Sequence, residues 1–354
     1  MSIPDRLLPA PPARGFSALR ALVLLVFLGM LAAGAYAWHD YRGFADAPLP
    51  VQRDDQTLVV ERGAGFRAIV AQMRRGELVP NNRLSELRWR LLARELGVDG
   101  RLHAGEYALP RGITPRELLR RMAAGEVVQH PFTIVDGWTF RQLRTALAAE
   151  SGLQQTLTTA TDEDIARRVG IDGGHPEGWF LPETYAWVRG ESDLDVLVRA
   201  HAAMNKALGR LWASRAPDVL LKTPYEALIL ASIVEKETGR AGERAEIAGV
   251  FMRRIKYGMR LQTDPTVIYG IGRDWDGNIR RRDLETDTPY NTYTRDGLPP
   301  TPIALPGVPA IEAALHPAPG DALYFVARGD GSHEFSPTLD AHNRAVRKYQ
   351  LRRE

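Results

Sequence analysis

Residues 21–38 form an uncharged apolar run, and this run decides on which side of a membrane the rest of the chain can fold. A helix needs about 20 such residues to cross the hydrocarbon core of a bilayer, so we expect a transmembrane helix over 21–41. Three arginines precede the run, the last of them Arg20, and Trp38 and Tyr41 stand at its far end. The positive-inside bias therefore predicts a cytoplasmic tail over 1–20 and an extracytoplasmic location for the remainder.

A cleaved signal peptide is the alternative interpretation of this segment, because Ala35-Tyr-Ala37 has the small-residue form of a cleavage site. The apolar part of a signal peptide usually measures about 7–15 residues, which is shorter than this run. The length favours an anchor over a cleaved signal. A buried core helix is the least favoured of the three.

The charge balance and the absence of cysteine exclude several kinds of site. The 354 residues hold 46 Lys and Arg against 43 Asp and Glu, a balance that disfavours nucleic-acid binding. Without cysteine there is neither a thiolate metal site nor a disulfide. The histidines near the end, His316, His333 and His342, fit no metal-ligand spacing and read as surface or hydrogen-bonding residues. We expect no metal and no cofactor.

The remaining length suffices for two domains, and the overall prediction is an α+β chain. Residues 42–55 carry two prolines and no apolar periodicity, so they read as a linker. Short strands and apolar helices then alternate over 56–135, ending in a strand over 127–135, which predicts a small α/β module. Residues 136–354 are mainly helical, except for a long proline-rich stretch over 258–310 that we expect to be irregular and functional.

A helix that starts at Pro224 and stops before Gly239 carries the best candidate for chemistry. Thr223 and Glu226 form a capping-box pattern at its start. Glu237 continues an apolar stripe, and a carboxylic acid held against an apolar wall has a raised pKa, as a general acid requires. Glu235 lies on the adjacent stripe and is the alternative catalytic residue. The ordinary interpretation, a solvated charged helix end, stays open at this point.

Polar and aromatic residues typical of a carbohydrate groove follow this helix, because aromatic rings pack on sugar faces while amides and carboxylates bind hydroxyls. The candidate substrate-binding residues are Gln262, Asp264, Tyr290, Asn291 and Tyr293, together with Glu183 from an earlier aromatic segment. Each has a plainer alternative. Asp264 can be a turn residue before Pro265, Asn291 a local backbone cap, and the tyrosines simple packing residues.

Several of these motifs together closely resemble the MltG (YceG-like) endolytic murein transglycosylases. The residues that carry the resemblance are Ala231-Ser-Ile-Val-Glu-Lys-Glu-Thr238, Arg260-Leu-Gln-Thr-Asp-Pro-Thr-Val-Ile-Tyr-Gly270, Tyr290-Asn-Thr-Tyr293, Gly297-Leu-Pro-Pro300 and His316-Pro317. The resemblance implies that 56–135 is a LysM-like glycan-binding subdomain and that 136–354 is the catalytic domain. It also matches the family's catalytic glutamate to Glu237.

The implied activity is cleavage of the β-1,4 bond between N-acetylmuramic acid and N-acetylglucosamine inside nascent peptidoglycan strands. The product would carry a 1,6-anhydro-MurNAc end, and strand elongation would stop there. The protein would sit in the bacterial inner membrane with its catalytic domain in the periplasm, and peptidoglycan synthases are candidate partners. Two alternatives remain, namely a hydrolase that uses Asp264 or Glu183 as a second carboxylate, and a non-catalytic glycan-binding scaffold.

Overall fold

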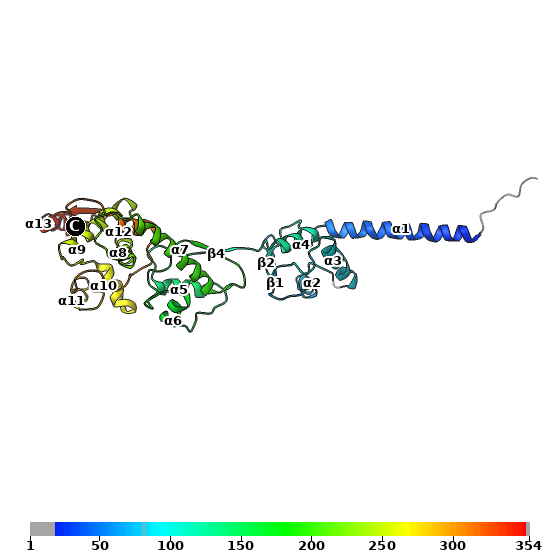
Figure 1. Cartoon of the computed structure of the whole chain (residues 1–354), viewed down its shortest axis with the longest axis horizontal. Helices are drawn as coiled ribbons and strands as arrows, with labels where there is room; N and C mark the ends of the chain where they lie inside the picture. Colours follow the sequence, from blue (N-terminus) through cyan, green and yellow to red (C-terminus); the bar gives the residue numbers. More distant parts are fainter. Residues whose placement is uncertain (1–17, 81, 352–354) are drawn as a thin grey trace, which may run out of the picture. The chain divides into compact units, whose positions relative to one another are not determined.

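The computed structural model describes residues 18–80 and 82–351, and the chain divides into two compact units, residues 1–128 and 129–354. Helices dominate both units, and every sheet in the described ranges has only two strands (Figure 1). The predicted mixture of many helices and few short strands is confirmed. Of the predicted tail over 1–20, residues 1–17 lie outside the described residues.

The first unit packs three helices and a strand pair beside a long N-terminal helix. Its elements are α1 (Ala18–Asp46), β1 (Thr57–Val60), α2 (Phe66–Arg75), α3 (Arg83–Glu95), β2 (Gly105–Ala108) and α4 (Pro115–Ala124). β1 and β2 pair antiparallel, with Leu58 opposite Tyr107. Helix α4 has a capped start and a glycine end, because Glu117 N donates to Thr114 Oγ1 at 3.2 Å and Gly125 ends the helix at φ 69°.

The apolar helix α1 does not end where the predicted linker begins. It is long and apolar enough to cross a membrane, and its apolar side chains from Leu19 to Trp38 are exposed. The helix then continues to Asp46, because Ala45 is fully buried in the core of the first unit and Phe44 packs edge-on against Trp89. The predicted linker over 42–55 is therefore a helix end followed by a loop that is partly tied to this core.

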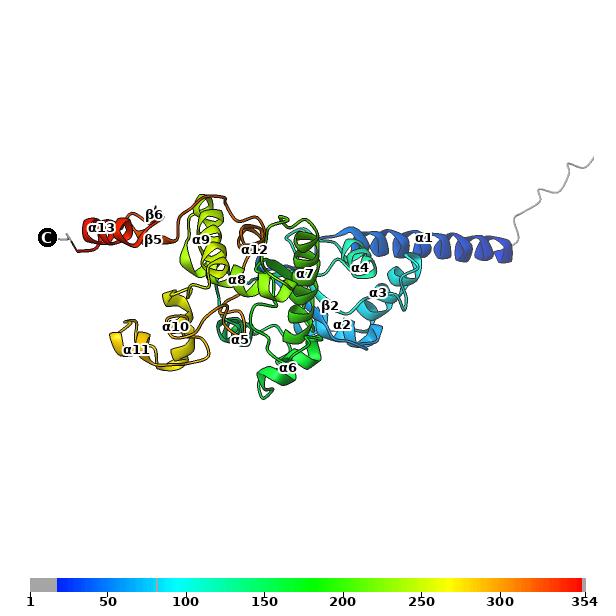
Figure 2. The same cartoon turned by 60° about the vertical axis from the view of Figure 1, so that its left-hand side comes forward.

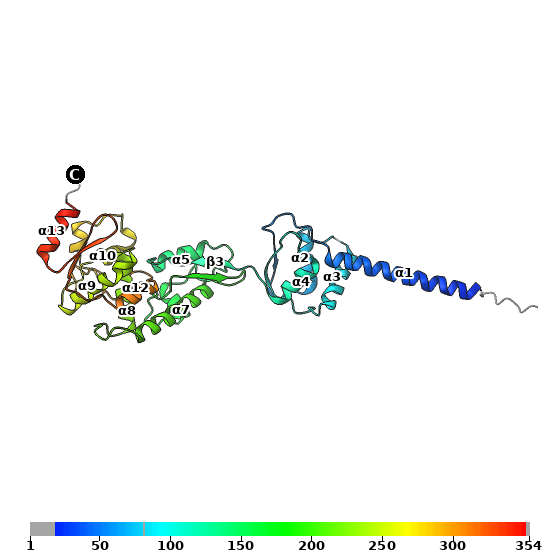
Figure 3. The ribbon, with the colours of Figure 1, turned by 90° about the horizontal axis from the view of Figure 1, so that it is seen from above.

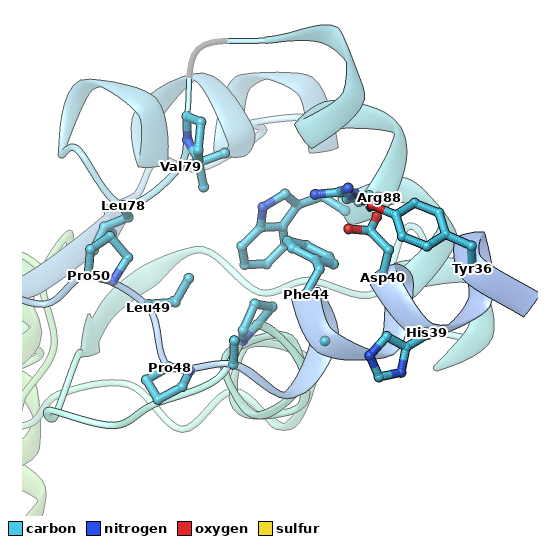
Figure 4. Close-up of a pocket in the computed structure, with 15 residues that line it drawn as sticks. Tyr36, His39, Asp40, Phe44, Pro48, Leu49, Pro50, Leu78, Val79 and Arg88 are labelled. Atoms are coloured by element: carbon cyan, nitrogen blue, oxygen red, sulfur yellow. Dashed lines mark hydrogen bonds and ion pairs between the residues drawn. The ribbon is translucent and has the colours of Figure 1, made fainter.

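A cavity of about 500 Å³ lies where α1 joins the first unit. Figure 4 shows Phe44, Leu49 and Val79 around it, with Arg88 next to Asp40 at one edge. Arg88 and Asp40 form an ion pair across the two helices. The last turns of α1 are thus held to the domain by both apolar and ionic contacts.

The second unit holds the remaining elements. They are β3 (His130–Thr133), α5 (Phe140–Ala149), α6 (Asp162–Val169), β4 (Thr184–Trp187), α7 (Asp193–Ala213), α8 (Pro224–Glu237), η1 (Ala241–Glu243), α9 (Arg244–Lys256), α10 (Asp264–Ile271), η2 (Gly272–Asp274), α11 (Arg281–Glu285), α12 (Val308–Leu315), β5 (Tyr324–Ala327), β6 (His333–Ser336) and α13 (Leu339–Tyr349). One core gathers around α8, α9 and α12, and another around α5, α6 and the β3–β4 pair. Helix α7 contributes to both, and Figures 2 and 3 show it beside α8.

Two sequence predictions about this unit are wrong. The strand predicted over 127–135 was assigned to the first module, but β3 pairs antiparallel with β4, which places it in the second unit. The stretch over 258–310 was expected to be irregular throughout, yet it contains α10 and α11. Proline at the start of α10 begins the helix there because its missing N–H is not needed in the first turn.

Candidate active site

The candidate catalytic helix α8 runs through the middle of the second unit and delivers Glu237 at its C-terminal end. It begins as predicted, with Glu226 N donating to Thr223 Oγ1 at 3.1 Å. All residues from Ala227 to Val234 are buried, so the helix is enclosed on every side rather than along one stripe. Its packing against α9 and α12 fixes the position of its last turn. The catalytic candidates therefore stand on a rigid support.

The side chain of Glu237 is partly buried and keeps some exposed surface. Thr263 Oγ1 donates a hydrogen bond to Glu237 Oε1. Burial raises the pKa of Glu237 to about 7 against this hydrogen bond, and the charge of Asp264 adds to the rise. Two neighbours, His333 and Arg254, act in the opposite direction and lower the pKa of Glu237. This carboxyl group can hold and release a proton near neutral pH, as a general acid and base must.

The side chain of Glu235, the alternative candidate, makes contacts that stabilise the fold. Its side chain is only 5% exposed and pairs with Arg244 at 3.2 Å. Its other oxygen accepts from Gly307 N at 3.1 Å, in the loop that leads into α12. Both oxygens are therefore engaged in holding α8 to neighbouring segments. The geometry favours Glu237 as the group available for proton transfer.

The segment before α10 forms the wall that meets Glu237. Three buried threonines brace it: Thr263 N donates to Thr292 Oγ1 at 3.1 Å, Thr266 Oγ1 lies 2.9 Å from Thr292 Oγ1, and Thr266 Oγ1 donates to Thr263 O at 2.7 Å. Gln262, exposed beside this wall, has φ 51°, a left-handed conformation that non-glycine residues rarely adopt. Strain of this kind gathers at functional sites, and Gln262 directly precedes Thr263, the hydrogen-bond donor to the carboxyl group of Glu237.

Asp264 and the predicted tyrosines lie close to this wall. Tyr293 OH donates to Asp264 Oδ1 at 2.6 Å, and burial followed by the contact with Asp264 raises the pKa of Tyr293. Tyr290 OH lies 2.9 Å from Thr301 Oγ1, and the Tyr290 ring meets that of Tyr269 edge-on at 4.8 Å. Tyr293 thus lies at the N-terminal end of α10, where it contacts Asp264. Tyr290 instead packs against Tyr269 and Thr301.

Two predicted site residues have other positions. Asn291 is buried, its amide nitrogen donates to the carbonyls of Asp283, Leu284 and Thr286, and its oxygen accepts from Tyr293 N at 2.9 Å. These bonds leave the Asn291 side chain no group free for a sugar. They match the alternative interpretation, in which Asn291 is a local backbone cap. Glu183 is exposed just before β4, a strand that packs in the core around α5 and α6 rather than in the core around α8. The structure does not bring Glu183 together with the groove residues.

Contacts from α9 and from the last strands tie further segments to the site, and the sequence patterns did not single out the first of them, Arg254. Buried Arg254 donates to Leu323 O and Leu261 O, both at 2.7 Å, and so ties the segment before β5 to the segment before the wall. His333 Nδ1 lies 2.7 Å from Glu243 Oε2. His333 was predicted to be a surface or hydrogen-bonding residue, and the hydrogen bond is present.

A cavity of about 780 Å³ lies beside the end of α8 and along α10. Lys236, Pro265 and Tyr269 line it, and Glu177 forms part of its wall. Glu177 is buried, and it accepts from Phe140 N at 2.9 Å and from Tyr269 OH at 3.1 Å. Burial raises the pKa of Glu177 to about 8 against these hydrogen bonds.

Glu177 was missed by the sequence patterns, and its neighbour carries the only local signal. Gly178 has φ 84°, and a Cβ there would lie 2.5 Å from Pro302 Cγ. A glycine is therefore needed where the Glu177 segment meets the loop before α12. Among the described residues, no group of three or more His, Asp or Glu side chains is arranged to hold a metal ion.

Comparison with known proteins gives one consistent result. The sequence model of the YceG-like family matches residues 58–348. The endolytic murein transglycosylase of Bacillus subtilis (strain 168) is 30% identical over 320 residues, covering 85% of this chain and 87% of that protein. Its namesake in Streptococcus pneumoniae serotype 2 is 27% identical, and the match covers 92% of this chain but 64% of that longer protein. The crystal structure of a YceG-like protein from Listeria monocytogenes aligns with a TM-score of 0.54 and 28% identity, covering 83% of this chain and 99% of that one.

Proposed function

Because this chain belongs to the YceG-like family and acts as an endolytic murein transglycosylase, we propose that Glu237 is its catalytic acid and base. The observation that carries the proposal is the partly buried Glu237 carboxyl group at the end of α8, which accepts a hydrogen bond from Thr263 and whose pKa is raised to about 7 by burial. A carboxyl group with that pKa is present in both protonation states at neutral pH. The contacts also favour Glu237 over Glu235, because both oxygens of Glu235 are engaged by Arg244 and Gly307.

The reaction needs one carboxyl group that works twice. Protonated Glu237 donates its proton to the oxygen of the scissile β-1,4 bond, and the C1–O bond to the leaving N-acetylglucosamine breaks. The carboxylate then takes the proton of the C6 hydroxyl of N-acetylmuramic acid as that oxygen bonds to C1 and closes the 1,6-anhydro ring. The nucleophile belongs to the substrate, so no second carboxylate and no added water are required.

The substrate groove, in this proposal, runs along the wall before α10. Gln262 is exposed there, and Asp264 and Tyr293 form a hydrogen-bonded pair beside the catalytic carboxyl group. The cavity lined by Lys236 and Tyr269 is a separate hollow further along α10, and neither Glu237 nor the predicted groove residues line it. Asn291 contributes indirectly, by holding the loop that carries Tyr293.

The first unit determines where cleavage occurs. The apolar helix α1 is consistent with a single-pass membrane anchor. We propose that it sits in the cytoplasmic membrane with its N-terminus inside, that the first unit is a LysM-like glycan-binding module, and that the second unit cuts strands outside. The nascent strands made by peptidoglycan synthases are the substrate that this arrangement favours.

Mass spectrometry of the products tests the reaction. The full-length chain in detergent is incubated with purified glycan strands, in parallel with Glu237→Gln and, as the matched control on the same helix, Glu235→Gln. Anhydro-ended fragments that disappear with Glu237→Gln alone are the expected result. Fragments that carry one added water would instead indicate a hydrolase, with Asp264 as the nearest second carboxylate. Intact strands would leave a glycan-binding scaffold.

A further inference from the structure

Helix α3 of the first unit exposes a stripe of leucines that its own domain does not cover. Leu84, Leu87 and Leu91 are 53%, 53% and 46% exposed. Their spacing of three and four residues places them on one face of the helix. The core-facing residues, among them Trp89 and Leu92, are fully buried on a different face. The helix is therefore apolar on two sides, and only one of them contacts protein within the described residues.

The position of α3 against α1 shows what this leucine stripe faces. Arg88 pairs with Asp40, and Tyr41 OH donates to Glu95, so α3 lies against the turn of α1 that follows Trp38. At 1.5 Å per residue, Asp40 stands only about 3 Å beyond Trp38 along the helix axis. Aromatic residues of this kind mark the boundary between lipid and water at the end of a membrane span. Helix α3 thus lies at the level of that boundary.

Figures 1, 2 and 3 agree that α3 lies on the side of the first unit from which the apolar part of α1 leaves. No flexible segment separates the span from the domain, because α1 is continuous to Asp46 and its Ala45 is buried in the domain core. The level of α3 relative to the span is therefore fixed by the fold.

The charges of α3 also suit a lipid surface. Arg83 and Arg94 are exposed, and by helical geometry they lie next to Leu87 on the flank away from Arg88. Helices that lie in the membrane interface combine an apolar face with flanking arginines that contact lipid headgroups. A helix-binding protein partner would equally need the leucines, but it would not explain why they lie beside the span.

We propose that the Leu84, Leu87 and Leu91 stripe of α3 lies in the lipid interface beside α1, as a second membrane contact of the first unit. The span and the stripe together would hold the domain against the bilayer in one orientation. This proposal does not depend on the catalytic role of Glu237 or on the reaction assigned to the second unit.

The absence of cysteine allows a direct test by single-site labelling. The full-length chain with Leu87→Cys is labelled with an environment-sensitive fluorophore and reconstituted in nanodiscs, with and without nitroxide-bearing lipids. Val59→Cys is the matched control, because Val59 is 37% exposed on β1 of the same unit. We expect a blue-shifted emission at position 87 that nitroxide lipids quench strongly, and unquenched emission at position 59.

A second variant, Leu91→Cys, repeats the measurement one turn further on and guards against local damage by the first label. Equal, weak quenching at positions 59, 87 and 91 would overturn the proposal. A probe at position 87 that is shielded from water but is not quenched by nitroxide lipids would also overturn it, since protein would then cover the stripe.

Discussion

Replacing Thr263 by valine is expected to move the pH dependence of cleavage toward alkaline pH. Thr263 donates to Glu237 Oε1, and this hydrogen bond stabilises the charged carboxylate. It therefore lowers the pKa of Glu237, which burial holds at about 7. Valine has nearly the same shape as threonine but no hydroxyl. Its substitution removes the opposing hydrogen bond, and the pKa of Glu237 rises further.

The size of the effect follows from the energy of such hydrogen bonds. A hydrogen bond to a charged group contributes about 1.5–3 kcal/mol, and one pKa unit corresponds to about 1.4 kcal/mol, so the pKa of Glu237 should rise by about 1–2 units. Cleavage requires the protonated acid, so activity is full below the pKa and declines as pH rises through it. The midpoint of the alkaline decline in kcat/KM should therefore move from about 7 to about 8–9.

The assay is the initial rate of anhydro-end formation on glycan strands between pH 5 and 10, for the unchanged chain, Thr263→Val and Thr263→Ser. Serine keeps the hydroxyl, so its midpoint should stay near that of the unchanged chain even if its overall rate falls. A midpoint for Thr263→Val that stays in place or moves to acidic pH would refute the assignment of the alkaline decline to Glu237.

Three further outcomes are expected. Glu235→Gln should keep the pH profile of cleavage but lower the thermal unfolding temperature, because the buried ion pair with Arg244 is lost. A changed pH profile with an unchanged unfolding temperature would contradict the structural role of Glu235. Gln262→Gly should raise the free energy of unfolding by about 1 kcal/mol by relieving the left-handed φ, while Gln262→Ala should not, and both should cleave more slowly. Between about pH 4.5 and 8 the folded state holds a proton on Glu177 that the unfolded state loses, so the free energy of unfolding falls as pH rises. Glu177→Gln should make this decline less steep in thermal unfolding measured across the same pH range. An equally steep decline would exclude Glu177 as its source.

Local signals in the sequence located helix ends well. The start of α8 at Pro224 was predicted because its cap depends on residues within one turn. Contacts between distant segments were not predictable in this way. β3 pairs with β4 across more than 50 residues, and α1 continues past Tyr41 because Ala45 finds a place in the domain core. Neither fact has a local sequence signature.

In the candidate site, too, residues marked by local patterns could be predicted, and residues whose roles depend on distant segments could not. Glu237 could be singled out because it ends a well-marked apolar helix, and the resemblance to a known family favoured it over Glu235. Thr263 and Glu177 could not, because a threonine donor and a buried carboxyl group acquire their roles only when α10 folds against α8 and α5. The role of Asn291 could not be predicted either, because an amide side chain can bind a sugar or cap a loop, and only the folded loop shows which backbone groups it meets.

The support that β6 gives to the catalytic region sets the time at which the enzyme can start to work. His333 contacts Glu243 from a position 96 residues after Glu237. At a synthesis rate of about 5–20 residues per second, a ribosome needs roughly 5–20 s to add that stretch. Until it emerges and folds, Glu243, just beyond the end of α8, lacks the hydrogen-bond partner that His333 provides. The catalytic region is therefore completed only when most of the chain has been synthesised.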